Sequence, residues 1–248
     1  MSFKARCQIL LAANHTTEKG EQRGPTGNAG EFFNSLSTEA ISEFKTLAMP
    51  SSIPEAAVLF TERQEPSKVL LLLEGRVKLS LNSIAGGRLI IGMARPGEIL
   101  GLPSALFGFP YEMTAESQFL CMIAQIPRQD FLDFLIRYPV ASINVARQLS
   151  LDHKRACEQL HTVGLTFSAP RKLARRLLQW CSDGEPDGIH TRFHCSLTHA
   201  EIGEHIGVSR ETITRTLIDF KNQGLVEQHG SILIVSNRKA LQALAGID

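Results

Sequence analysis

The sequence predicts an α+β chain in which an antiparallel β-barrel or sandwich precedes a long helix and a winged helix-turn-helix. Three observations predict this order. Short apolar runs separated by turn residues fill residues 54–127. A stretch of more than twenty residues without Gly or Pro ends at Gly164. A helix–glycine–helix pattern begins at Thr198 and is followed by a hairpin pattern.

The β region is expected as a domain over residues 31–138, after a polar, glycine-rich segment, residues 1–30, that is expected to be a flexible tail. A first helix is expected near Ser37, which suits an N-cap. Five runs each predict a strand or a strand pair: AAVLF, KVLLLLEGRVKLSLN, RLIIGMA, ILGLPSALFG and QFLCMIAQIP. A short helix should follow from Arg128 and end before Pro139.

The long helix is expected over residues 139–164. One set of its residues recurs in steps of three and four, which is the seam spacing of a coiled coil: Ala146, Leu149, His153, Ala156, Leu160 and Val163. The seam predicts a dimer interface. The alternative is an ordinary helix that packs only on its own domain.

Composition limits the class of protein. The net charge is +1, so a polyanionic partner must be met by a local patch. The five cysteines are odd in number and widely spaced, which argues for reduced thiols and against a disulfide scaffold. No apolar run reaches the ~18–20 residues of a membrane span, and we expect a cytoplasmic protein. The sequence also lacks a P-loop, an H-E-x-x-H motif and a nucleophile–base pair, so an enzyme is not expected.

The last region, residues 165–248, carries the most specific pattern. Thr198 and Glu201 form a capping box for a helix of about eight residues. Gly207 should end that helix with a positive φ, and Ser209 should cap a second helix over residues 210–223. A hairpin turning at His229-Gly230 would form a wing. Together these elements predict a DNA-binding winged helix-turn-helix.

The second helix, residues 210–223, carries a cluster of charged residues. Such a cluster is either a solvated surface or a surface that reads DNA. Arg210 and Glu211 lie in its first turn and Arg215 lies further along. An arginine can bond guanine O6 and N7, and a glutamate can accept from cytosine N4 in the major groove. We therefore predict base reading by these three residues. Phosphate contacts are expected from the hydroxyl residues at the helix starts: Thr198, Ser209, Thr212 and Thr214.

The order of domains, with GVSRETITR, LLLEGRVKLSL and RPGEILG, resembles the CRP/FNR family of bacterial transcription regulators. The resemblance covers about residues 32–245. It implies an antiparallel β-roll, a jelly roll like that of cyclic-nucleotide-binding domains, as the sensor. It also implies a homodimer, an inverted repeat with TGTGA-like half-sites, and contact with RNA polymerase.

The sensor departs from the cyclic-AMP-binding members of that family. By resemblance, an effector pocket would include Gly97, Glu98, Gly101, Leu102, Thr114, Cys157 and Glu158. The family needs an acidic residue after G-E-x-x-G, but Leu102 stands there. No Arg or Lys occurs between Arg95 and Arg128 to clamp a phosphate. The sequence therefore argues against cyclic AMP as the signal. An iron–sulfur cluster, as in the oxygen-sensing members, lacks its cysteines.

Three hypotheses for the signal remain open. The β domain could bind another small molecule or cofactor, it could be only a scaffold in an effector-free or redox-responsive protein, or a metal or haem could be bound. His153, Cys157 and His161 are spaced four residues apart on the long helix, so they could provide ligands for a metal or haem. The plainer interpretation is that they are a seam residue, a small filler and an exposed histidine, with no metal and no certain cofactor.

Overall fold

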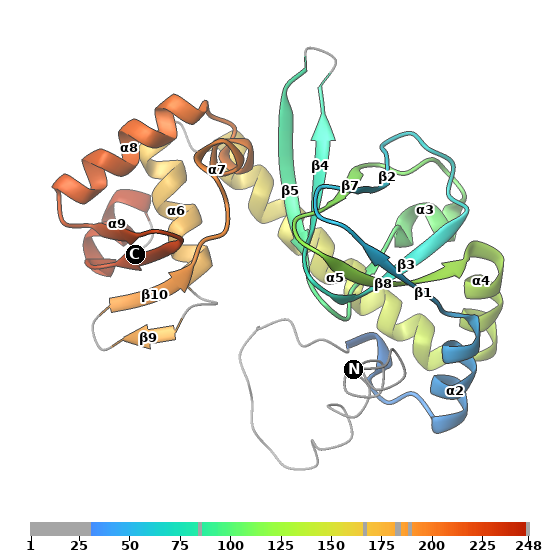
Figure 1. Cartoon of the computed structure of the whole chain (residues 1–248). Helices are drawn as coiled ribbons and strands as arrows, with labels where there is room; N and C mark the ends of the chain where they lie inside the picture. The colour runs from blue at the N-terminus through green and yellow to red at the C-terminus, as the bar shows by residue number, and fades with distance from the viewer. Residues whose placement is uncertain (1–30, 84–85, 166–167, 182–184, 188–189, 247–248) are drawn as a thin grey trace. The chain divides into compact units, whose positions relative to one another are not determined.

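The computed structural model describes residues 31–83, 86–165, 168–181, 185–187 and 190–246. The chain divides into two compact units, one ending at Arg155 and the other starting at Ala156. This division falls within the helix expected over residues 139–164. The expected tail, residues 1–30, lies outside the described residues. Figure 1 follows the elements of both units in chain order by colour.

Two four-stranded antiparallel sheets form the first unit (Figure 1). One has the strand order β1-β8-β3-β6 and the other has the order β2-β7-β4-β5. The bounds of the strands are β1 Met49–Ile53, β2 Val58–Phe60, β3 Lys68–Glu74, β4 Val77–Asn82, β5 Arg88–Ala94, β6 Ile99–Leu100, β7 Thr114–Ser117 and β8 Cys121–Pro127. The predicted antiparallel β-roll is confirmed.

Strand β3 is covered on both faces, which explains its continuous apolar run. Val69, Leu71 and Leu73 pack into one cluster of buried side chains. Leu70 and Leu72 point the other way, into the cluster between the two sheets that contains Phe60 and Tyr111. Successive side chains of a strand alternate between its faces, so a strand buried on both sides carries no polar alternation.

Helices cover the outer side of this unit. They are α2 Thr38–Leu47, α3 Leu102–Phe107, α4 Arg128–Arg137 and α5 Pro139–Leu160, after a short 3₁₀ turn at Glu31–Phe33. Ser37 caps α2 by accepting a hydrogen bond from the amide of Ala40 at 3.1 Å, as predicted. The rings of four phenylalanines, Phe32, Phe44, Phe131 and Phe134, pack against one another in tilted and T-shaped contacts.

One predicted strand was wrong. The run ILGLPSALFG forms only the two-residue strand β6 and then helix α3. Gly101 has a φ of 80°, which turns the chain out of the sheet, and a proline lies in the first turn of α3 where its missing N–H costs nothing. Strands β1 and β7 were not predicted, because their sequences, MPSSI and TAES, show little apolar alternation.

The second unit contains a helical core and one sheet with the order β11-β12-β10-β9. A π-helical turn, His161–Leu165, follows α5. The other elements are α6 Ala169–Cys181, β9 Glu185–Asp187, β10 His190–His194, α7 His199–Ile206, α8 Arg210–Asn222, β11 Val226–His229, β12 Ile232–Val235 and α9 Arg238–Ala245. Their buried side chains form a separate core around Leu173, Leu177 and Phe220. The predicted winged helix-turn-helix is confirmed.

Candidate nucleic-acid interface

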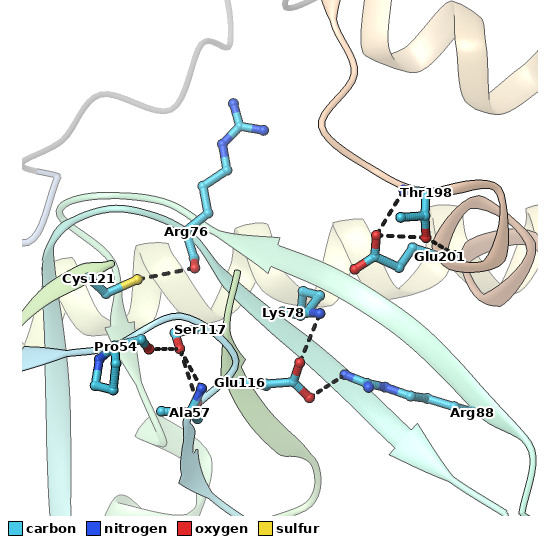
Figure 2. A network of polar contacts seen from close by, with 10 residues as sticks. All are labelled: Pro54, Ala57, Arg76, Lys78, Arg88, Glu116, Ser117, Cys121, Thr198 and Glu201. Atoms are coloured by element: carbon cyan, nitrogen blue, oxygen red, sulfur yellow. Dashed lines mark hydrogen bonds and ion pairs between the residues drawn. The ribbon is translucent and has the colours of Figure 1, made fainter. Parts of the chain in front are cut away.

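Helix α7 starts with the predicted capping box. The hydroxyl of Thr198 accepts a hydrogen bond from the amide of Glu201 at 3.2 Å. The amide of Thr198 donates in turn to the carboxylate of Glu201 at 2.8 Å (Figure 2). Two of the amides left free at a helix start are thereby satisfied. Gly207 ends the helix with a φ of 67°, as predicted.

The corner between α7 and α8 (Figure 1) depends on a close approach at Gly203. A Cβ atom at this position would lie 2.5 Å from the carbonyl oxygen of Val208. A polar contact also joins the two helices, since Nδ1 of His199 lies 2.9 Å from the hydroxyl of Thr214. The start of α8 is therefore fixed against α7 by backbone packing and by one side-chain hydrogen bond.

Helix α8 has a buried face and an exposed face. Ser209 caps it by accepting from the amide of Thr212 at 3.2 Å. Ile213, Leu217 and Phe220 are at most 2% exposed and hold the helix on the core of the unit. Because these side chains are three or four residues apart, they leave the opposite face of the helix free for a partner.

The exposed face holds all three predicted base readers. A shallow cleft of about 480 Å³ is lined by Arg210, Glu211, Thr214, Arg215, Ile218 and Asp219. Within the described part of the chain, no hydrogen bond or ion pair engages the guanidinium group of Arg210 or of Arg215. Their donors are thus available to base edges.

The side chain of Glu211 is a hydrogen-bond acceptor on the exposed face of α8. Its own backbone amide and the hydroxyl of Ser209 donate to its carboxylate and, with the charge of Arg210, hold the pKa of Glu211 below its usual value. The carboxylate is therefore ionised at neutral pH. An ionised carboxylate accepts hydrogen bonds only, which suits the amino group of a cytosine or an adenine.

The wing lies directly after α8. Strands β11 and β12 pair antiparallel, with Gly230 at a φ of 60° in the turn. The side-chain oxygen of Gln228 accepts from the ammonium of Lys221 at 3.0 Å. This hydrogen bond links the end of α8 to the wing, so that both belong to one surface.

In the first unit, Tyr111 fills the space beside Gly101. Its hydroxyl donates to the carbonyl oxygen of Lys68 at 2.7 Å. Its ring stacks on Phe60 with the centroids 4.1 Å apart. One ring carbon lies 2.8 Å from the place where a Cβ of Gly101 would be. Side chains of this chain therefore occupy the position next to the G-E-x-x-G motif.

Side chains of helix α5 contact the second and third residues of the same motif, Glu98 and Ile99. The side-chain amide of Gln148 accepts from the backbone N–H of Ile99 at 3.0 Å and donates to its carbonyl at 2.8 Å. The guanidinium of Arg155 contacts Glu98 at 2.8 Å and Asp152 at 3.2 Å. Burial, followed by the charge of Glu98, raises the pKa of Asp152. Glu98 thus already has a cationic partner from its own chain.

The charged residues in the strands of the sheet β2-β7-β4-β5 also pair with one another. Glu116 lies between Lys78, at 2.8 Å, and Arg88, at 3.1 Å (Figure 2). Burial alone would raise the pKa of Glu116, but the two cations outweigh burial and lower it. The hydroxyl of Thr114, another predicted pocket residue, accepts from the amide of Glu62 at 3.1 Å and from Asn82 at 3.3 Å.

Cys157 and Glu158, predicted for the effector pocket, belong to the second unit. They line an open cleft of about 520 Å³ with residues of α6 and α9, among them Arg175 and Arg238. Arg175 also contacts Nδ1 of His161 at 2.6 Å.

In the part of the chain that the structure covers, no three His, Cys, Asp or Glu side chains are grouped to hold a metal. None of the described helices has the length and apolar character needed to cross a membrane.

Sequence reasoning missed several of these contributors. Tyr111, Gln148 and Arg155 gave no local signal, because their roles depend on partners distant in sequence. Ile218 was also missed, although its position could have been found. It follows Glu211 by seven residues, which places both on the same stripe of an α-helix.

Comparison with known families assigns both halves of the chain. Residues 50–138 match the model of the cyclic nucleotide-binding domain, and residues 171–244 match that of the Crp-like helix-turn-helix domain. A CRP-like cAMP-activated global transcriptional regulator of Mycobacterium tuberculosis is 23% identical over 84% of this chain and 93% of its own. The transcriptional activatory protein AadR of Rhodopseudomonas palustris is 27% identical over 82% of this chain and 84% of its own.

Solved structures share the fold. A CooA mutant from Carboxydothermus hydrogenoformans has a TM-score of 0.72 at 22% identity, covering 90% of this chain and 98% of its own. FixK2 from Bradyrhizobium japonicum has a TM-score of 0.69 at 20% identity, covering 79% of this chain and 96% of its own. With a cyclic nucleotide-binding domain followed by a Crp-like helix-turn-helix, the chain belongs to the CRP/FNR family of transcription regulators, which are not enzymes.

Proposed function

We propose that this regulator reads its DNA site through the exposed face of α8, with Arg210, Glu211 and Arg215 at base edges. The observation that supports this most directly is that the guanidinium groups of Arg210 and Arg215 have no hydrogen-bond or ion-pair partner among the described residues, on a helix whose opposite face is anchored in the core. A bidentate arginine–guanine pair contributes about 1–3 kcal/mol of discrimination against a wrong base.

Contacts to the phosphates would come from the starts of the two helices. The hydroxyls of Thr198 and Ser209 are used for capping, and the amide of Thr198 already donates to Glu201. The remaining amides at the two helix starts and the helix dipoles therefore supply the attraction for phosphate. Thr212 and Thr214 stand beside the base readers on α8. These contacts fix the position of the helix on the duplex but carry no sequence information.

The active form in this proposal is a homodimer on an inverted repeat with TGTGA-like half-sites, which also contacts RNA polymerase as the family does. In the single chain, the predicted seam residues Ala146 and His153 are exposed, and Leu160 is 68% exposed. Burial of Leu160 against a second copy would remove this apolar surface from water. Sedimentation of Leu160→Asp should show monomers where the wild type is dimeric. A dimeric variant would contradict the seam.

The signal in this proposal is not cyclic AMP. A cyclic phosphate needs a cationic clamp, and residues 96–127 contain no Arg or Lys. Glu98 already pairs with Arg155, and Tyr111 fills the space at Gly101. The residues present therefore do not fit that nucleotide. Calorimetric titration with cyclic AMP and cyclic GMP should give no binding heat and no change in DNA affinity, and saturable binding would overturn this part.

Base reading is tested by a matched pair of variants on a palindromic TGTGA-type duplex. Arg210→Ala should weaken binding by about 1–3 kcal/mol and relax the preference at one base pair per half-site. Arg171→Ala, an exposed arginine on α6, is the control and should retain that preference. If Arg210→Ala weakens binding equally on all sequences, the residue contacts phosphate only.

A further inference from the structure

Ile218 is an exposed apolar residue at the centre of a polar surface. It is 51% exposed, whereas Ile213, Leu217 and Phe220 on the same helix are at most 2% exposed. A single exposed isoleucine is common on protein surfaces and needs no explanation by itself. Its place among the proposed base readers is the feature that calls for one.

The helix geometry aligns Ile218 with the base readers. It follows Arg215 by three residues, Thr214 by four and Glu211 by seven, so it lies on their stripe of α8. It also lines the same cleft of about 480 Å³. Seven residues of α-helix rise about 10 Å, and base pairs are spaced about 3.4 Å apart, so Ile218 faces a base pair two to three steps from that of Glu211.

The chemistry of this position excludes a phosphate contact. Isoleucine has no hydrogen-bond donor, and the neighbouring carboxylate of Asp219, which lines the same cleft, repels phosphate. In the major groove, the apolar group that a base pair presents is the C5-methyl of thymine. A branched aliphatic side chain on the groove-facing stripe matches that methyl.

We propose that Ile218 is a further specificity determinant, which packs against the methyl group of one thymine in or beside each half-site. The proposal rests on base reading by α8 and adds one position to it. It selects thymine over cytosine by contact, since cytosine lacks the methyl group and presents a polar amino group instead.

The experiment removes the methyl group from the DNA. Each thymine of the half-site and its flanks is replaced singly by deoxyuridine, which keeps the base pairing but lacks the methyl. At one position, the replacement should lower the affinity of the wild-type protein about fourfold, which corresponds to ~0.8 kcal/mol for one buried methyl-sized group. With Ile218→Ala, that loss should disappear. Leu244→Ala, a 36% exposed apolar residue on α9, is the control and should keep the wild-type pattern.

Two outcomes would overturn the inference: no position at which the wild type senses uracil, or a sensitivity that Ile218→Ala retains. Both leave the Arg210→Ala result untouched, because that variant is scored at a different base pair. The reverse result is also possible: Arg210→Ala leaves the base preference of the wild type unchanged, while Ile218→Ala removes the loss of affinity caused by deoxyuridine. In that case base reading by Arg210 is wrong and the thymine contact of Ile218 stands.

Discussion

Replacement of Gly203 by alanine should test whether the α7–α8 corner sets the position of the reading helix. The added Cβ would lie 2.5 Å from the carbonyl oxygen of Val208 and 3.5 Å from the backbone nitrogen of Arg210. Side-chain Cβ atoms are almost never found within 3.0 Å of another heavy atom. The backbone at the start of α8 must therefore move by at least half an ångström, because the clashing atom is not a flexible side chain.

The energetic expectation combines two opposing terms. Packing too much volume into a close contact costs about 1–3 kcal/mol. Alanine also gains about 1 kcal/mol over glycine inside a helix. Gly164→Ala is the matched control in the same unit, since its Cβ would meet nothing within 4 Å. We expect the free energy of unfolding of Gly203→Ala to lie about 1–3 kcal/mol below that of Gly164→Ala.

The assay uses urea unfolding, followed by the fluorescence of Trp180, the single tryptophan of the chain, which is half-buried and packs against the core of the second unit. DNA affinity is measured on folded protein at the same time. Gly203→Ala should bind its site more weakly even where it is fully folded, because the first turn of α8 has moved. The reasoning is refuted if Gly203→Ala matches Gly164→Ala in both stability and affinity.

Three further predictions concern other contacts. Thr198→Ala should cost about 1 kcal/mol of unfolding free energy through loss of the cap, and Thr198→Ser should restore it. Burial lowers the pKa of His205 from 6.5 to about 3, so the unfolded chain binds a proton that the folded chain does not. The contribution of His205 to the free energy of unfolding should therefore be complete above pH 6.5 and fall by roughly 1.4 kcal/mol per pH unit below it. The free energy of unfolding of His205→Leu should depend less on pH. Urea unfolding, followed by Trp180 fluorescence at each pH, measures both. Arg155→Ala should cost about 0.5–1 kcal/mol and speed amide hydrogen exchange near Glu98, with Arg155→Lys closer to wild type.

The second unit was predictable because its signals are local. Caps, the glycine corner and the apolar spacing of α8 lie within a few residues of the atoms they organise. Thr198 satisfies the amide of Glu201 three residues away, and Ser209 satisfies that of Thr212 three residues away. A sequence pattern records such contacts directly, so the helix bounds and the exposed face of α8 followed from it.

The first unit was less predictable because its partners are remote. Met49 of β1 pairs with Gln125 of β8, and nothing in MPSSI marks it as a strand until that partner is known. The opposite error occurred at ILGLPSALFG, where apolar residues were read as strand. Leu102 is buried there on a helix, and hydrophobicity alone does not distinguish a buried strand from a buried short helix.

The contacts of Gln148 with Ile99 show why a binding role for the first unit cannot be assigned from sequence alone. The side-chain amide of Gln148 forms hydrogen bonds with both the backbone N–H and the carbonyl of Ile99, as a neighbouring strand would. The guanidinium of Arg155 pairs with the carboxylate of the preceding residue, Glu98. Each such hydrogen bond contributes about 0.5–1.5 kcal/mol, and buried backbone groups left unpaired cost more. A molecule that acted at this segment would have to replace those bonds as well as form its own. A molecule that leaves these bonds intact therefore has a smaller cost to overcome than one that displaces Gln148 or Arg155.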